Sequence, residues 1–236
     1  MLGKLWGLAH EKGTRVIVAL DTIPAEPYLI IEFIKEYAVG LKIGLPFLLR
    51  WGPEIIRNLC EKYGEALYML CDMKLADIPY VVSEELILIK ELGFDGAIVH
   101  VFQGGIQELS KLSNRPNLFG LIAMSHPQST LIDAHLEDLL KAVIDAGAEG
   151  CVVPATKPDI IGRVRRLAPR LTLLAPGIGA QGPQPGSAIE AGADFEIIGR
   201  AVTLSEDPSR ACKVARDEIN AIIKKQTSKW DGCLNG

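Results

Sequence analysis

The chain has 236 residues, and its 25 Lys and Arg nearly balance its 29 Asp and Glu, which gives a formal net charge of −4. The 48% hydrophobic content excludes a disordered chain, and the small negative charge provides no chain-wide attraction for nucleic acid or an anionic membrane. No apolar stretch reaches the ~18 residues of a membrane span, no signal-peptide pattern opens the chain, and five scattered cysteines form no CxxC pair, so we expect a cytoplasmic protein with reduced thiols.

Short apolar runs rich in β-branched residues alternate with longer segments of helical period along most of the chain. The apolar runs predict strands at residues 15–20, 39–43, 67–72, 96–100, 118–123, 150–153, 171–175 and 195–198. The segments between and after them predict helices near residues 26–37, 53–63, 82–92, 105–112, 133–146, 157–168, 185–192 and 208–224. Fully apolar strands are typical of a parallel sheet that is covered on both faces.

Eight successive βα units favour a closed (β/α)8 barrel, or TIM barrel, as a single α/β domain. The alternative is an open, doubly wound sheet, which usually has fewer strands and often a second domain. We place the barrel at residues 15–224. Residues 1–14 form an N-terminal extension, in which we expect a short helix that closes the bottom of the barrel. Residues 225–236 lose apolar periodicity and predict a loose C-terminal tail.

Charged residues of both signs lie in or just after the carboxyl ends of the first three predicted strands, at the end of a barrel where chemistry is found. These residues are Asp21, Lys42, Asp72, Lys74 and Asp77. Taken alone, Lys42 could extend from the strand end to solvent, and the DMKLAD segment could be a strand end followed by a helix cap. Together they predict an alternating cluster of lysines and aspartates, because buried charges must be paired.

Glycine-rich segments follow the last two predicted strands. GIGAQG at 177–182 matches GxGxxG, but a dinucleotide fingerprint normally opens a domain, whereas this motif lies near the end of the chain. A phosphate site of a barrel is the better interpretation, with Gly199 and Arg200 completing it. The alternative is a flexible loop and a surface arginine. Four histidines form no HxH or HExxH pattern, so we predict no metal site.

Seven motifs together resemble those of the orotidine 5′-phosphate decarboxylase family in its compact archaeal form. They cover roughly residues 15–222 and are ALD at 19–21, LKIG at 41–44, DMKLADIP at 72–79, VH at 99–100, MSHP at 124–127, APGIGAQG at 175–182 and IIGRA at 197–201, with DMKLADIP matching the DxKxxDIP signature. The resemblance implies decarboxylation of orotidine 5′-monophosphate to UMP in pyrimidine biosynthesis, without metal or organic cofactor.

The resemblance also implies a role for each charged residue. Lys74 would protonate C6 as CO2 leaves, and Asp72 would lie against the substrate carboxylate. Lys42 and Asp77 would complete the array, with Asp77 reaching in from the partner subunit of a homodimer. Asp21 and Lys42 would hold the ribose hydroxyls.

The remaining implied residues bind the two ends of the nucleotide. Ser125 would read the pyrimidine, and Ile78 would line the base pocket. Gln181 would bridge the loop and the phosphate, which Gly199 and Arg200 would also bind. The chain departs from the family at Val81, where Thr or Ser usually contacts ribose across the dimer, and in residues 182–187, which differ from the common GGxxG style.

Two alternatives to this activity remain. One is a metal-dependent decarboxylase of a 3-keto sugar-acid phosphate, or the related hexulose-phosphate synthase, in which a carboxylate commonly replaces the lysine of the second strand. Lys42 argues against that class. The other is a barrel that only binds a nucleotide or phosphate, which would have no need of the full charge array.

Overall fold

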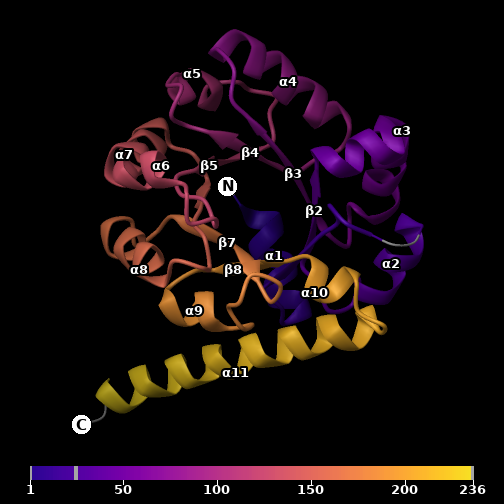
Figure 1. Cartoon of the computed structure of the whole chain (residues 1–236), viewed down its shortest axis with the longest axis vertical. Coiled ribbons are helices and arrows are strands. Elements are labelled where there is room, and N and C mark those ends of the chain that lie inside the picture. The colour runs from indigo at the N-terminus through magenta and orange to yellow at the C-terminus, as the bar shows by residue number, and fades with distance from the viewer. Residues whose placement is uncertain (1, 24–25, 235–236) are drawn as a thin grey trace.

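The computed structural model describes residues 2–23 and 26–234, and these residues form a closed barrel of parallel strands inside a ring of helices (Figure 1). The strands are hydrogen-bonded in chain order, and the last pairs with the first. They are β1 (Val16–Ala19), β2 (Gly40–Gly44), β3 (Tyr68–Leu75), β4 (Gly96–His100), β5 (Asn117–Leu121), β6 (Gly150–Val152), β7 (Thr172–Ile178) and β8 (Phe195–Ile198). The predicted (β/α)8 barrel is confirmed. Each predicted strand overlaps an observed one, and their ends differ by three residues or fewer.

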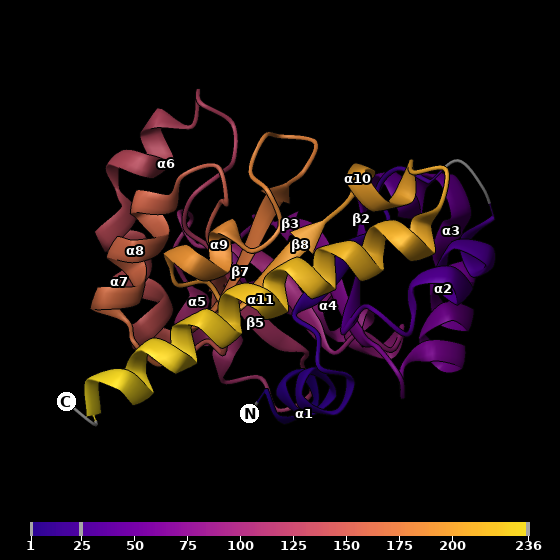
Figure 2. The same cartoon turned by 90° about the horizontal axis from the view of Figure 1, so that it is seen from below.

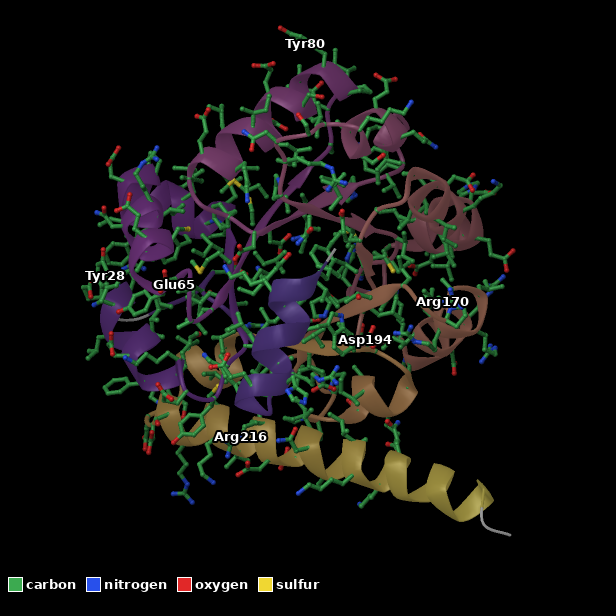
Figure 3. The ribbon with its side chains drawn as sticks, turned by 180° about the vertical axis from the view of Figure 1, so that it is seen from behind. Tyr28, Glu65, Tyr80, Arg170, Asp194 and Arg216 are labelled. Carbon is green, nitrogen blue, oxygen red and sulfur yellow. The ribbon has the colours of Figure 1, made fainter. Side chains whose placement is uncertain are left out.

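Both faces of the strands are buried, which explains why their sequences are continuously apolar. On β1, Ile17 belongs to the cluster inside the barrel, whereas Val16 and Val18 belong to the cluster between the barrel and the helices. The same alternation holds on β8, where Phe195 and Ile197 face the barrel interior. Side chains from the first helix, α1 (Gly3–Lys12), join the interior cluster, so this helix covers one end of the barrel (Figure 3).

The outer helices differ from their predicted ranges in length more than in place. They are α2 (Pro27–Ile34), α3 (Leu45–Tyr63), α4 (Pro79–Glu91), α5 (Ile106–Ser110), α6 (Thr130–Ala134), α7 (Leu136–Ala146), α8 (Pro158–Leu167), α9 (Ser187–Ala191), α10 (Arg200–Thr203) and α11 (Pro208–Leu234). The predicted helix 53–63 is only the second part of α3, which Gly52 interrupts with a φ of 76°. The sequence predicts no helix at α10, because its four residues are too few to show a helical period.

Helix α11 also continues through residues 225–234, although the loss of apolar periodicity there predicts a loose tail. Its last turns extend past the barrel beyond α9 (Figure 1), so no apolar face is required of them. Residues 235–236 of the predicted tail lie outside the described residues.

Three carboxylates brace the end of the barrel that α1 covers. Each is the residue directly before a strand: Asp95 before β4, Glu149 before β6 and Asp194 before β8. Each accepts a backbone N–H at the start of the preceding strand, from Met69 at 2.9 Å, Leu118 at 2.7 Å and Leu173 at 2.8 Å respectively. Each also pairs with a cation, respectively Lys4, Arg115 and Arg165. We call these contacts the bottom clasps, and Asp194 is seen beside α1 in Figure 3.

The helices and the cysteines agree with what the composition predicts. Within residues 2–23 and 26–234, no helix is both long enough and apolar enough to span a membrane. Four cysteines, Cys60, Cys71, Cys151 and Cys212, are buried and unpaired, and burial raises the pKa of each thiol. These thiols are therefore unreactive side chains of the core.

Candidate active site

A cavity of about 250 Å³ opens at the carboxyl ends of the strands, opposite α1. Eight of the ten residues that the sequence singled out line this cavity: Asp21, Lys42, Asp72, Lys74, Ser125, Gln181, Gly199 and Arg200. They come from the ends of six strands or the loops after them, β1, β2, β3, β5, β7 and β8. The cavity has a charged side, an apolar floor and a side rich in glycine.

The charged side is an alternating chain of three ion pairs. The Lys42 Nζ lies 2.6 Å from Asp21 Oδ2 and 2.9 Å from Asp72 Oδ2. The other oxygen of Asp72, Oδ1, accepts a hydrogen bond from Lys74 Nζ at 2.8 Å. Leu41 and Ile43 face the helices, which turns Lys42 toward the barrel axis. The predicted cluster therefore forms within one chain from four of its five charged residues.

Lys42 and Asp72 are both buried, so each needs the opposite charge beside it to stay ionised. The side chains of Lys42 and Asp72 are each only 7% exposed, whereas Lys74 is 41% exposed and faces the cavity mouth. Burial alone would lower the pKa of Lys42, but Asp72 and Asp21 outweigh it and raise that pKa. Burial alone would raise the pKa of Asp72, but Lys42 and Lys74 outweigh it and lower that pKa. Both groups are therefore charged at neutral pH.

The backbone at Lys74 is in a conformation that few side-chain-bearing residues adopt. Its φ is 49°, and no other non-glycine residue in the described ranges has a positive φ. The register between β3 and β4 shifts between Cys71 and Leu75, so the strand bulges at this point. Such a conformation costs about 1–3 kcal/mol and persists where surrounding contacts hold it. Here the bulge directs the Lys74 ammonium onto Asp72.

Gly44 is a site residue whose role the sequence did not reveal. It pairs with Asp72 across β2 and β3. A Cβ added at Gly44 would lie 2.3 Å from Asp21 Oδ1. Only glycine therefore lets the Asp21 carboxylate approach β2 and reach Lys42. The LKIG motif contains this glycine, but a single sequence does not show what lies against it.

The floor of the cavity is apolar and suits a flat ring. It is formed by Ile98, Leu121, Val152 and Ile197 from β4, β5, β6 and β8. Ser125 lies at the edge of this floor, and its loop is held by the Thr156 hydroxyl, which donates to the Ser125 carbonyl at 2.8 Å.

The glycine-rich side presents the guanidinium of Arg200 to the cavity. Gly177 and Gly179 have φ values of 106° and 76°, which glycine adopts without strain. A Cβ placed on Gly177 would lie 3.2 Å from Gln181 Oε1, so this glycine makes room for the Gln181 side chain. Arg200 begins α10 at the cavity wall, and among the described residues no carboxylate pairs with it. This side of the cavity therefore suits an anionic ligand.

The two remaining predicted residues, Asp77 and Ile78, do not line the cavity of the single chain. Asp77 Oδ1 accepts the backbone N–H of Ile78 at 2.7 Å, which orders the start of α4. The Ile78 side chain is 62% exposed, and Tyr80 next to it is 73% exposed and projects from the edge of the molecule (Figure 3). Val81, the departure from the family pattern, lies in the first turn of α4.

His100 lies near the charge cluster without joining it. Burial and the Lys74 ammonium lower its pKa, and Asp72 opposes them. The ring packs edge-on against Phe102 at 4.9 Å. The imidazole is therefore neutral at neutral pH. It is no third cation beside the two lysines.

Comparisons with known proteins agree with this geometry. The sequence model of the Orotidine 5'-phosphate decarboxylase / HUMPS family matches residues 14–215. The orotidine 5'-phosphate decarboxylase of Aeropyrum pernix is 39% identical over 230 residues, covering 89% of this chain and 91% of the relative. The crystal structure of orotidine 5'-monophosphate decarboxylase from Sulfolobus solfataricus superposes with a TM-score of 0.81 at 30% identity, over 89% of this chain and 99% of that one.

A further solved structure is the Methanocaldococcus jannaschii orotidine 5'-monophosphate decarboxylase complexed with the inhibitor BMP. Its TM-score is 0.77 at 28% identity, over 88% of this chain and 99% of that one. The match to the family model covers most of the chain, and the curated relative shares more than a third of its residues. The chain therefore belongs to the orotidine 5′-phosphate decarboxylase / HUMPS family.

Proposed function

We propose that this protein decarboxylates orotidine 5′-monophosphate to UMP and CO2, a step of pyrimidine nucleotide synthesis in the cytoplasm. The observation that carries the proposal is one cavity with the Lys42–Asp72–Lys74 array on one side and the unpaired Arg200 on the other. The apolar floor between them suits a pyrimidine ring. Relatives across the length of the chain are named for this reaction, and a solved relative holds an inhibitor.

In this proposal, Lys74 supplies the proton that replaces CO2. The bond between C6 and the carboxyl carbon breaks, CO2 leaves, and the electron pair remains at C6. The Lys74 ammonium stabilises that negative charge and then donates its proton to C6, which leaves a neutral amine that solvent reprotonates. Because Asp72 fixes Lys74 Nζ at 2.8 Å, the ammonium is positioned before the substrate arrives.

Asp72 has a second proposed role toward the substrate carboxylate. Its own carboxylate would lie against that group and disfavour the bound ground state relative to the transition state, in which CO2 is leaving. Asp21 and Lys42 would hold the ribose hydroxyls beside them. Gln181, Gly199 and Arg200 would bind the phosphate, and Ser125 would read the pyrimidine.

The reaction is proposed to need no metal or organic cofactor. The Lys42 ammonium lies between Asp21 and Asp72, where it would repel a divalent cation. This favours decarboxylation of the nucleotide over the metal-dependent sugar-phosphate reactions of sister enzymes. Among the described residues, no three His, Cys, Asp or Glu side chains are grouped as metal ligands.

The decisive experiment follows the ultraviolet change of the orotate ring when pure protein is mixed with orotidine 5′-monophosphate and EDTA. We expect decay of the orotate absorbance in proportion to enzyme. An absence of decay would overturn the proposed function, and decay that requires added Mg²⁺ would overturn its metal independence.

We further propose a homodimer in which Asp77 enters the partner's cavity. Asp77 is exposed at the rim, beside the exposed apolar side chains of Ile78, Tyr80 and Phe102. Near this rim, Glu85 Oε2 and His100 Nδ1 are buried and have no hydrogen-bond partner among the residues that the structure describes. A second copy would cover the apolar side chains and bring Asp77 toward Lys74.

Mixing two inactive variants tests this sharing. An Asp77→Ala subunit and a Lys74→Ala subunit should together restore about a quarter to a half of the activity per dimer, because one of the two cavities is then intact. The mass in sedimentation should be that of two chains. A monomer, or a mixture that stays inactive, would contradict the shared site.

A further inference from the structure

Glu196 is a fully buried acid in the middle of a barrel strand. It is 0% exposed on β8, and because Phe195 and Ile197 face the barrel interior, its side chain faces the helices. No lysine or arginine pairs with it among the described residues. A buried carboxylate without a cation is costly, so its hydrogen bonds indicate what it does.

Three backbone N–H groups at the end of one loop donate to this carboxylate. Gly186 donates to Oε2 at 2.8 Å, and Ala188 and Ile189 donate to Oε1 at 2.9 and 3.2 Å. Burial raises the pKa of Glu196, and these three donors oppose the shift. The carboxylate thus binds the junction between the loop after β7 and α9.

That loop carries Gln181 on the face that lines the cavity. Within it, the Gly179 N–H donates to the Pro183 carbonyl at 2.7 Å, and the Gly182 N–H donates to the Gly179 carbonyl at 2.9 Å. The loop is therefore a compact turn that rises above the barrel at the end opposite α1 (Figure 2). Its position depends on how its two ends are held.

Close packing holds both ends of the loop, whereas its side toward α11 borders a cavity. A Cβ on Gly179 would lie 2.6 Å from the Ala201 Cβ, and one on Gly186 would lie 2.8 Å from Ile222 Cγ1. Behind the loop, a second cavity of about 500 Å³ separates Gln184 and Pro185 from α11. Glu196 is thus a polar tether at the end of a loop whose Gln184 and Pro185 border this second cavity.

Gly199 and Arg200 follow Glu196 three and four residues later, directly after the end of β8. We infer that Glu196 is a positioning residue that ties the Gln181 loop to β8, and so sets the spacing between Gln181 and Arg200 for the phosphate of the substrate. This inference rests on the proposed function for the identity of the substrate. It concerns binding of the phosphate and leaves the reacting atoms to the lysine and aspartate array.

The Glu196→Gln variant tests the tether with almost no change in shape. The amide oxygen can still accept from Ala188 and Ile189, but its NH2 would face the Gly186 N–H, so one anchor is lost. We expect kcat/KM for orotidine 5′-monophosphate to fall about tenfold, mainly through KM, which corresponds to roughly 1.4 kcal/mol. For orotidine, which lacks the phosphate, kcat/KM should change less than about twofold.

Glu190→Gln is the matched control, because Glu190 lies on the same short helix but is exposed. It should leave both substrates unaffected. Equal losses on orotidine and its monophosphate would show that Glu196 only supports the fold, and would overturn the inference. Unchanged kinetics on both substrates in Glu196→Gln would also overturn it.

Two further measurements keep the inference separate from folding and from the proposed function. If Glu196→Gln has no cooperative thermal transition, Gly186→Ala replaces it, since its Cβ pushes the same junction away from α11 and should give the same selective loss. If the wild-type protein fails to decarboxylate, the proposed function is refuted. The dissociation constant of inorganic phosphate then tests the tether: a rise of about tenfold in the variant supports it, and an unchanged value overturns it.

Discussion

Replacing Lys42 by methionine should remove the central cation of the buried ion-pair chain and leave the buried Asp72 with Lys74 as its remaining partner. Methionine matches the length of the lysine stem and adds no polar group, so the change in packing is small. At an effective dielectric constant of about 20, unit charges 2.9 Å apart attract by about 6 kcal/mol before desolvation is counted. Because Asp72 keeps Lys74 as a partner, we expect the lower end of the observed range for broken buried pairs, about 3 kcal/mol of unfolding free energy.

The unfolding free energy that Lys42→Met loses should depend on pH, and the pKa shifts of Asp72 and Lys42 give the direction. The folded-state pKa of Asp72 lies below its ordinary value of 3.8, so its stabilising contribution is present above that pH and is lost as pH falls through the folded value. The folded-state pKa of Lys42 lies above 10.5, so its contribution is present below that pH and is lost as pH rises through the folded value. The gap between the wild type and the variant should therefore be constant near neutrality and narrow in acid below pH 3.8.

Urea unfolding followed by circular dichroism measures this gap at about pH 7 and about pH 3.5. The matched control is Lys141→Met, which breaks an exposed pair with Asp145 whose lysine is 73% exposed, and which should cost about 0.5 kcal/mol or less. A Lys42→Met loss no larger than that of the control would refute the assignment of a buried pair. A loss that is equally large in acid would show that packing, and not charge, is responsible.

Three other substitutions probe separate parts of the molecule. Lys74→Ala should nearly abolish turnover while UMP still binds in calorimetry, and substantial residual turnover would exclude the proton-donor role. Arg200→Ala should lower kcat/KM for orotidine 5′-monophosphate by about 10- to 100-fold, the loss of one charged hydrogen-bonding group, and change orotidine turnover little; an equal effect on both substrates would contradict a phosphate contact. Asp194→Ala removes the acceptor of Arg165 Nη2 and of the Leu173 N–H, so the free energy of unfolding should fall by about 2 kcal/mol with kcat unchanged; a change in kcat would show that the bottom clasps reach the active site.

The sequence predicts the barrel well because its signals are local. Each strand is an apolar run with turn residues on both sides, and the carboxyl ends of the runs carry the polar residues that meet in the cavity. Lys42 could be recognised because a lysine inside the apolar run VGLKIGL would be a costly buried charge unless an acid pairs with it. Helix lengths were predicted less well, since Gly52 interrupts α3 without ending it.

Other features depend on contacts between distant residues, and no local pattern reveals them. Glu196 looks like an ordinary charge in FEII until Gly186, ten residues earlier, is placed against it. The positive φ of Lys74 follows from a bulge between two strands, and propensity gives no sign of it. Asp77 and Ile78 do not line the cavity of their own chain, and the proposed role of Asp77 depends on a second chain that the sequence of one does not contain.

The bottom clasps also bear on the order in which the barrel assembles. They join residues 26, 31 and 21 positions apart and so link β3 to β4, β5 to β6, and β7 to β8 over short lengths of chain. The pairing of β1 with β8, by contrast, brings Val16 to Glu196 across nearly the whole chain. Since loop-closure entropy favours the short links, we expect these βαβ units to form early and the β1–β8 seam to close last. A circular permutant opened between two clasped units should then fold at a rate close to that of the parent, whereas a break inside a clasped unit should slow folding.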